Sequence, residues 1–440
     1  MNSMDNMLLV YSKSSPPRLK YIFSLIFVEL LKLEIKFTLD VEYFKGYDGP
    51  KINYSETRLG NELHFVPSTL LFETAIEKQD INLFEWTGNK AFFKVDDRSA
   101  FPFDPFAAAF YLVSRYEEYL PHASDQHGRY IAEQSLAYMH GFLNKPLINI
   151  WAIKIKESMQ QKHPSIAFIE SKFEYINTID IDNAYAYKGK GFVRTGGALA
   201  RALLKLDFNE FRARFDVLFR NSHDPFDTYQ YIKELSAEYG AKTIYFFLVG
   251  GLSEYDRNLS INRKAYKEII KTISGYSNVG IHPSYASNND KNTLESEINN
   301  LSSLLNKDIK RSRQHFLKLT MPTTYQQLIS LGIKEDYTMG YASQVGFRAS
   351  ICRPFFFYDL MNDRTTELKV VPFAAMDATL NNYLKLSPDK AQKTIRMLIK
   401  ETKSVDGLFI SLWHNETLSE MNEWKGWSQV YLDMIKAATA

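Results

Sequence analysis

The sequence has a single cysteine, no marked excess of charge of either sign and no long uninterrupted apolar run. Cys352 alone cannot form a disulfide within the chain. The 53 Lys and Arg nearly balance the 51 Asp and Glu, and no block of five or more like charges occurs. A basic patch of the kind that binds nucleic acid is therefore not indicated, and we predict no nucleic-acid partner.

The N-terminus lacks the positively charged start, apolar core and small-residue cleavage site of a secretory signal peptide. The most membrane-like stretch is residues 21–39, but it carries Glu29, Lys32, Glu34 and Lys36. A membrane span needs about 20 mostly apolar residues, so four charges argue against one here. The pattern is typical of an amphipathic helix running into a strand. We expect a soluble, cytoplasmic protein without a membrane span.

A chain of 440 residues is long enough for two or three domains. The sequence predicts a smaller α/β domain over residues 1–165, whose role it does not reveal. Its expected strands and helices are 36–40, 61–68, 90–95, 104–120 and 148–162. Pro164 and Ser165 mark the predicted end of this domain.

Beyond residue 170 the pattern changes to strands that alternate with helices. Expected strands are 174–182, 242–250, 277–284, 311–319, 335–342 and 407–415; expected helices are 226–240, 264–274 and 292–307. This alternation implies parallel strands, in an open sheet or a barrel. In both architectures functional residues gather at the C-terminal ends of the strands.

Two aspartates, Asp180 and Asp182, lie one residue apart at the end of the first of these strands. Residues two apart in a strand share a face, and two neighbouring carboxylates repel each other and raise at least one pKa. One interpretation is structural: each Asp caps the following turn. The other is a metal-bound carboxylate beside a second carboxylate that acts as a base, with the cation offsetting the repulsion.

Three further strand ends carry side chains suited to chemistry: His282, Arg313 with His315, and His414. We interpret His282 as a metal ligand, although a turn histidine is the alternative. We interpret His414 as a general acid or base, against a structural core histidine. Arg313 could orient a carboxylate or lie on the surface. The repetition of such residues at successive strand ends favours one shared site.

Taken in chain order, five segments resemble motifs of the polysaccharide deacetylase family, the NodB-homology or carbohydrate esterase family 4 proteins. TIDIDN (178–183) stands in the place of T-F-D-D-G, and KTIYFFLVG (242–250) is similar to A-T-F-F-x-x-G. GIHPSYA (280–286) is similar to G-x-H-[ST]-x-x-H, RQHF (313–316) loosely to R-x-P-Y, and ISLWH (410–414) to the terminal L-x-H. The first 165 residues resemble the N-terminal domain of a group of uncharacterised bacterial proteins, notably from the Bacteroidetes.

This resemblance implies a distorted (β/α)7-type barrel over residues 170–440, preceded by the smaller α/β domain. It implies a hydrolase that removes N- or O-linked acetyl groups from a glycan or related carbohydrate. By the same resemblance Asp180 would be the general base, and Asp182 and His282 would hold a divalent metal such as zinc. His414 would protonate the leaving group, and Arg313 would tune Asp180.

The chain departs from the family pattern at three places. Ile181 separates the two aspartates, Asn183 replaces a glycine, and Ala286 occupies the position of the second metal-binding histidine. The third protein ligand would then be Asp180 or His315, and with Asp180 as ligand His414 would become the base. Two alternatives to the hydrolase follow: a catalytically silent glycan-binding or assembly protein on the same barrel, and an unrelated barrel enzyme such as a sugar isomerase.

Overall fold

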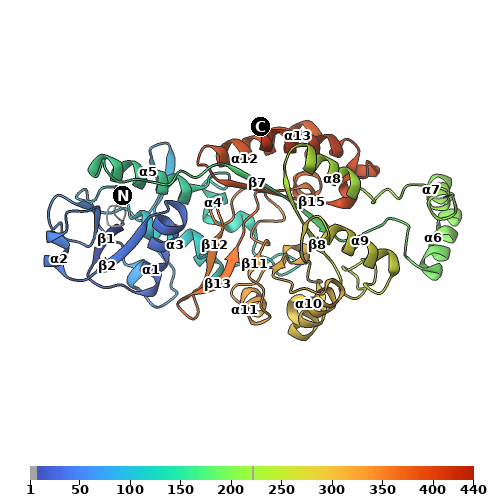
Figure 1. The fold of residues 1–440 in the computed structure, drawn as a ribbon, viewed down its shortest axis with the longest axis horizontal. Helices are drawn as coiled ribbons and strands as arrows, with labels where there is room; N and C mark the ends of the chain where they lie inside the picture. The colour runs from blue at the N-terminus through green and yellow to red at the C-terminus, as the bar shows by residue number, and fades with distance from the viewer. Residues whose placement is uncertain (1–6, 221) are drawn as a thin grey trace.

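The computed structural model describes residues 7–220 and 222–440, and two β-sheets organise the chain (Figure 1). The N-terminal sheet has the strand order β2-β1-β3-β4, and every pairing in it is parallel. Its strands are β1 (Met7–Ser12), β2 (Glu34–Thr38), β3 (Lys51–Tyr54) and β4 (Leu63–Phe65), and a separate hairpin joins β5 (Phe84–Trp86) and β6 (Asn89–Ala91). The helices of this part are α1 (Pro17–Phe23), α2 (Val41–Gly46), α3 (Pro105–Val113), α4 (Leu136–Met139) and α5 (Leu147–Lys162).

Two predicted helices of this part show how local chemistry sets element ends. The predicted helix running into a strand is confirmed: α1 continues as a π-helical stretch over Ser24–Leu30 and leads into β2. The helix predicted over 104–120 begins as expected, because the Asp104 carboxylate accepts hydrogen bonds from the backbone N–H groups of Phe106 and Ala107 in the first turn of α3. It ends early, at Val113, since Arg115 adopts a left-handed backbone conformation with φ of 56°.

The second sheet contains nine strands in the order β12-β13-β11-β10-β9-β8-β7-β15-β14. All its pairings are parallel except that of β12 with β13. The strands are β7 (Glu174–Ile181), β8 (Lys242–Phe247), β9 (Asn278–Ile281), β10 (Arg311–Ser312), β11 (Glu335–Asp336), β12 (Phe355–Asp359), β13 (Arg364–Val370), β14 (Ala375–Met376) and β15 (Leu408–His414).

The segment 364–376 closes this sheet into a barrel. It contains β13, which pairs with β11, and β14, which pairs with β15. At one end the Val371 N–H donates to the Asp336 carbonyl oxygen beside β11 (2.8 Å). A few residues on, the Ala374 N–H donates to the Ile410 carbonyl oxygen of β15 (3.0 Å). The predicted distorted (β/α)7-type barrel is therefore confirmed, with β7, β8, β9, β10, β11, the β13–β14 segment and β15 as its seven strands.

Helices follow most of the barrel strands and surround the barrel (Figure 1). They are α8 (Tyr229–Glu238), α9 (Lys264–Ser274), α10 (Lys291–Leu305), α11 (Thr323–Ser330), α12 (Pro388–Lys403) and α13 (Trp427–Thr439). Inside the barrel, apolar side chains form their own cluster, which includes Ile244, Phe246, Phe373, Ile410 and Leu412. This cluster fills the barrel below its polar mouth, as in other (β/α) barrels. In the described part of the chain, no helix is long and apolar enough to cross a membrane.

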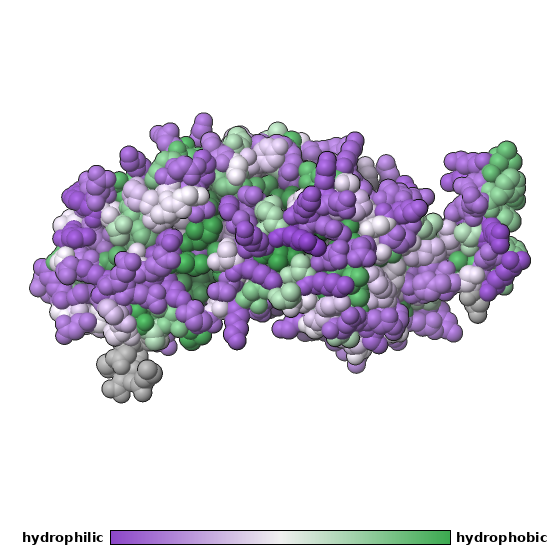
Figure 2. Space-filling model, turned by 90° about the horizontal axis from the view of Figure 1, so that it is seen from above, coloured by the Kyte–Doolittle hydropathy of each residue, from purple (hydrophilic) through white to green (hydrophobic). Residues whose placement is uncertain are grey.

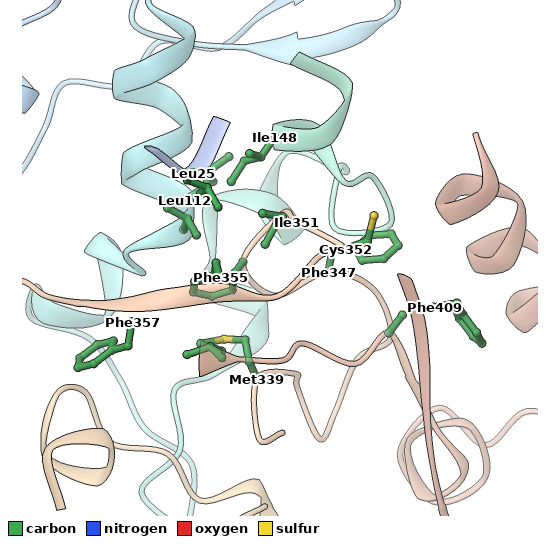
Figure 3. Packing of buried hydrophobic residues seen from close by; sticks show 14 of the residues in the cluster. Leu25, Leu112, Ile148, Met339, Phe347, Ile351, Cys352, Phe355, Phe357 and Phe409 are labelled. Atoms are coloured by element: carbon green, nitrogen blue, oxygen red, sulfur yellow. The ribbon is translucent and has the colours of Figure 1, made fainter. Parts of the chain in front are cut away.

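A hydrophobic core joins the N-terminal part to the barrel through the hairpin of β12 and β13 (Figure 3). Phe355 and Phe357 of β12 are buried in a cluster that also contains Leu112 of α3 and Ile148 of α5. The aromatic side chains Phe355 and Phe357 of β12 are thus part of the core. The domain boundary expected near residue 165 remains a prediction.

A buried ion-pair network also joins the two parts of the chain. Glu118 accepts hydrogen bonds from Arg115 Nε (2.8 Å) and from Arg348 Nη2 in the barrel (2.7 Å), and its side chain is 3% exposed. We expect Glu118→Gln to lower the free energy of unfolding by about 3–5 kcal/mol, because it leaves the buried Arg348 guanidinium without its charge partner and leaves Arg115 with Glu117 alone. Denaturant titration measures this, and Glu42→Gln, in an exposed pair with Lys45, should leave the free energy nearly unchanged.

The same network predicts a dependence of stability on pH. Burial raises the pKa of Glu118, but Arg348 and Arg115 outweigh burial and bring the pKa down to about 2. The carboxyl of an unfolded chain titrates near pH 4.3. Stability from this group is therefore fully present above that pH and is lost as the pH falls towards 2. Between these values Glu118→Gln should show a weaker loss of stability than the wild type; equal slopes would contradict the assignment.

Candidate active site

Polar side chains converge at the C-terminal mouth of the barrel, around a cavity of about 260 Å³. Asp180 and Asp182 come from the end of β7, and His282 follows β9. His315 follows β10, and His414 ends β15. All five line the cavity. Strand ends that are far apart in the sequence meet here because the parallel strands all point to the same end of the barrel.

Asp180 is tied to the barrel interior by Arg313, and both side chains are buried. Arg313 donates from Nη1 to Asp180 Oδ1 (2.9 Å) and from Nε to the Tyr337 carbonyl oxygen (3.0 Å). Its guanidinium also lies over the ring of Phe246, 4.7 Å from the centroid. Of the two interpretations of Arg313, the structure therefore supports orientation of a carboxylate and excludes a surface position. The contact is a single hydrogen bond and not a bidentate pair.

Asp182, His282 and His315 form a cluster in which one possible ligand atom of each lies within 4.8 Å of the others. Asp182 Oδ1 is 3.2 Å from His282 Nε2, and Asp182 Oδ2 is 3.4 Å from His315 Nε2. Asp180 Oδ2 lies slightly farther, 3.7 Å from His282 Nε2. The structure thus brings His315 beside Asp182 and His282 and keeps Asp180 on Arg313.

The two histidines of the cluster are oriented by their other ring nitrogens. His282 Nδ1 lies 2.6 Å from the Arg313 carbonyl oxygen, which can only accept a hydrogen bond, so Nδ1 carries the proton and donates it. In the neutral ring the lone pair of Nε2 is then available to bind a cation. His315 Nδ1 lies 2.8 Å from Asp256 Oδ1, and Asp256 is buried. Metal-binding histidines usually have such a carbonyl or carboxylate partner, which fixes the tautomer and the ring direction.

The cluster suits a divalent cation on two grounds. Within the described residues, Asp182 Oδ1 is buried without a hydrogen-bond partner. Two imidazole nitrogens and one carboxylate are also a donor set that zinc takes at catalytic sites. Burial raises the pKa of Asp182, but His315 and His282 outweigh burial and hold it well below its ordinary value. Asp182 is therefore an ionised carboxylate that faces two imidazole rings.

His414 lies next to the cluster, at the end of β15, the strand that pairs with β7. Its Nε2 is 3.8 Å from Asp182 Oδ2, and its Nδ1 is 2.9 and 3.1 Å from the two carboxylate oxygens of Asp377. Asp377 is fully buried and also accepts hydrogen bonds from the His414 N–H and the Thr417 hydroxyl. Burial lowers the pKa of His414, but Asp377 outweighs burial and raises it well above its ordinary value. His414 is therefore suited to carry a proton into the cavity.

Four residues of the site were not predicted from the sequence. Asp256 orients His315, and Asp377 orients His414. Like Asp180, Asp377 comes at the end of an apolar strand, a pattern that is present in the sequence. Glu416 lines the cavity and accepts a hydrogen bond from Asn183; its burial, followed by its proximity to Asp182, raises its pKa to about 6.

The fourth residue is Arg129, which reaches the cavity wall from the N-terminal part of the chain. It donates to the Phe316 carbonyl oxygen (2.8 Å) and to the Tyr383 hydroxyl (3.3 Å). The N-terminal part therefore contributes a wall of the site. Ala286, which stands at the family's second histidine position, is exposed on a short 3-10 helix.

A seven-stranded (β/α) barrel carries Asp and His side chains at its C-terminal mouth, which is the arrangement that the resemblance to polysaccharide deacetylases implies. Solved structures similar to the chain include polysaccharide deacetylases.

Three solved structures show how far the similarity to this chain extends. A protein of Mycobacterium smegmatis classed as a polysaccharide deacetylase is 12% identical, with a TM-score of 0.40 over 62% of this chain and 87% of that chain. A polysaccharide deacetylase of Bacillus cereus is 12% identical, with a TM-score of 0.29 over 60% and 87%. A CE4 family pseudoenzyme of Bacillus anthracis is 11% identical, with a TM-score of 0.27 over 59% and 61%.

The N-terminal part matches a different kind of family. The profile of a family of unknown function, DUF7033, matches residues 8–164. No curated protein matches the chain.

Proposed function

We propose that this chain is a metal-dependent hydrolase that removes acetyl groups, N- or O-linked, from a carbohydrate. One observation carries the proposal: a possible metal-binding cluster, a carboxylate held by a buried arginine and a histidine held by a buried carboxylate meet in one cavity. Metal-assisted hydrolysis of an amide or ester needs these three elements together.

Asp182, His282 and His315 would hold the cation, with zinc as the best match to the donor set. When bound, the cation would polarise the acetyl carbonyl group and lower the pKa of the attacking water. His315 would supply the ligand that the family pattern places at position 286. Its position supports the enzyme over the catalytically silent alternative, which had its main support in Ala286.

Asp180 would accept a proton from the attacking water. Its Oδ1 is held by Arg313, and its Oδ2 faces His282 Nε2 at 3.7 Å, on the cavity side of the barrel. The fixed hydrogen bond restricts the carboxylate to one orientation, so that Oδ2 is the oxygen left to act as base. In this proposal Asp182 binds the cation and Asp180 accepts the proton.

His414 would donate a proton from Nε2 to the leaving nitrogen or oxygen of the sugar. The carboxylate of Asp377 accepts from Nδ1 and stabilises the protonated ring. Met376 and Leu412 line the same cavity and would contact the acetyl methyl group. Tyr383 and Trp424, also in the wall, offer aromatic faces for a sugar ring.

The proposal is tested by metal analysis and product detection on the purified full-length chain. We expect about one equivalent of divalent metal per chain by mass spectrometry after zinc loading and removal of excess ion, and release of acetate from acetylated oligosaccharides. Chelation should stop the release, and zinc should restore it. A chain that holds no stoichiometric divalent metal under metal-replete conditions would end the hydrolase proposal.

A further prediction concerns Asp256, the carboxylate that contacts His315 Nδ1. Replacing Asp256 by asparagine keeps the shape of the side chain but removes the charge that orients the ring. We expect a 10- to 100-fold loss of zinc affinity, as is usual when such an outer partner is changed. Competition with a zinc-binding dye measures the affinity. Asp227→Asn, which changes an aspartate outside the cavity lining, serves as the matched control; equal zinc affinity in Asp256→Asn and the wild type would contradict the role of Asp256.

A further inference from the structure

A helical hairpin projects from the barrel between β7 and α8 and has no role in the site described above. It consists of α6 (Phe192–Leu204) and α7 (Phe208–Phe219). Figure 1 shows the two helices standing apart from the rest of the chain, at the far right. Among the described elements, α6 and α7 pack mainly against each other. The hairpin therefore presents most of its surface to the surroundings.

This surface is unusually apolar. Eighteen large apolar side chains are exposed in the described chain, and six of them lie within this short hairpin. They are Leu203 (46% exposed), Leu204 (86%), Leu206 (72%), Phe208 (63%), Phe215 (37%) and Phe219 (65%). Figure 2 shows apolar residues in green on the projecting arm, next to hydrophilic residues in purple. A gathered apolar surface of this kind marks an interaction site more often than scattered exposed residues do.

The apolar residues of α7 follow a helical stripe. Phe208, Phe211, Phe215 and Phe219 are three or four residues apart, so they lie along one face of the helix. The rings of Phe211 and Phe215 are 6.3 Å apart and those of Phe215 and Phe219 are 4.8 Å apart. The exposed leucines at the end of α6 lie close to this stripe in the chain, since only three residues, 205–207, separate the two helices.

The hairpin is basic when its flanking residues are included, whereas residues 192–219 alone carry five Lys and Arg against three Asp and Glu, a net charge of +2. Residues 188–220 contain eight Lys and Arg against three Asp and Glu, a formal net charge of +5, whereas the whole chain has only +2. Arg212 and Arg220 flank the phenylalanine stripe with side chains 80% and 65% exposed; both pair with Asp216, so one positive charge of this group is not offset. The positive charge of the chain is therefore concentrated where its apolar surface is exposed.

We propose that the hairpin of α6 and α7 docks on the surface of an anionic phospholipid bilayer. Helices that lie in a membrane interface combine a Leu- and Phe-rich face with a Lys- and Arg-rich flank, as this hairpin does. Anionic headgroups attract basic segments, and the apolar stripe would enter the boundary between headgroups and acyl chains. Pairing of two copies of the hairpin is less favourable, since it would bring two segments of charge +5 together.

The position of the hairpin in the chain links membrane docking to the candidate active site. The hairpin follows the C-terminal end of β7, the end that carries Asp180 and Asp182. Docking would hold that end of the barrel close to the membrane surface. The inference itself does not rest on the proposed hydrolase function, because lipid binding can be measured without substrate.

The test is co-sedimentation of the full-length chain with vesicles of equal parts phosphatidylglycerol and phosphatidylcholine. We expect binding to these vesicles, weaker binding in high salt, and little binding to phosphatidylcholine alone. The double variant Leu204→Ser, Phe208→Ser should lose about tenfold or more in affinity. The matched control, Ile169→Ser with Met361→Ser, removes two apolar side chains elsewhere that are 66% and 65% exposed, and it should bind like the wild type.

Four results would overturn the proposal. They are no binding by the wild type, equal binding to both kinds of vesicle, equal binding by the hairpin and control variants, and a change from dimer to monomer on hairpin substitution. The last result, seen by light scattering, would assign the surface to self-association. Should the double variant unfold, Phe208→Trp provides a second measurement: its fluorescence should shift to the blue on adding anionic vesicles, and an unchanged spectrum would overturn the proposal as well.

Discussion

Replacing Asp182 by alanine is expected to leave the protein without stoichiometric divalent metal and to abolish acetyl release. Asp182 is the one residue of the cluster that faces both His282 and His315, with oxygens 3.2 and 3.4 Å from their Nε2 atoms. Two histidines alone are one ligand short of the three protein ligands of catalytic zinc sites. Metal analysis after zinc loading and an acetate-release assay measure both effects on the same preparation.

The matched control for this variant is Glu416→Gln. Glu416 lines the same cavity, but its hydrogen bond goes to Asn183 and not to the histidines. We expect it to retain one equivalent of zinc, which separates loss of a ligand from a general loss of negative charge in the cavity. Full zinc occupancy in Asp182→Ala would refute the assignment of the cluster as the metal site.

The barrel could be predicted from the sequence because its outer helices and main strands follow simple periodic patterns. The helix predicted over 264–274 is α9 with the same ends, and the strand predicted over 407–415 is β15 within one residue at each end. The strands expected over 311–319 and 335–342 are much shorter in the structure, two residues each. At the first of these, Phe316 and Leu317 adopt positive φ of 59° and 52°, which turns the chain away from the sheet.

Other parts of the fold had no signal that sequence periodicity could detect. The closing segment 364–376 pairs with β11 at one end and with β15 at the other, with Pro372 between them. Only the three-dimensional barrel brings these partners together. The hairpin of α6 and α7, in contrast, shows helical spacing in the phenylalanines of α7, but no helix was predicted there.

The site was predictable to the extent that it depends on strand ends. Asp180, Asp182, His282 and His414 meet at one mouth because they follow parallel strands, as expected. His315 was only one of two options for the third ligand, since no local pattern distinguishes it from Asp180. The outer partner Asp256 could not be found, because it lies on a loop and its contact with His315 spans 59 residues.

Replacing Asp180 by asparagine is the second prediction with a large expected effect. Asparagine has nearly the same shape but cannot accept the proton of the attacking water at neutral pH. We expect kcat to fall by about 10²–10⁴-fold, the usual contribution of a general base. Zinc content should stay at one equivalent, because Asp180 is engaged by Arg313 and lies outside the cluster of Asp182, His282 and His315.

The comparison that decides between the two carboxylate roles is Asp180→Asn against His414→Gln. If Asp180 is the base and His414 the acid, both variants should keep zinc and both should lose kcat. A leaving group that needs no protonation, as in an aryl acetate, should then rescue His414→Gln and leave Asp180→Asn inactive. Rescue of neither variant, together with loss of zinc from Asp180→Asn, would mean that Asp180 is a metal ligand and that His414 acts as the base.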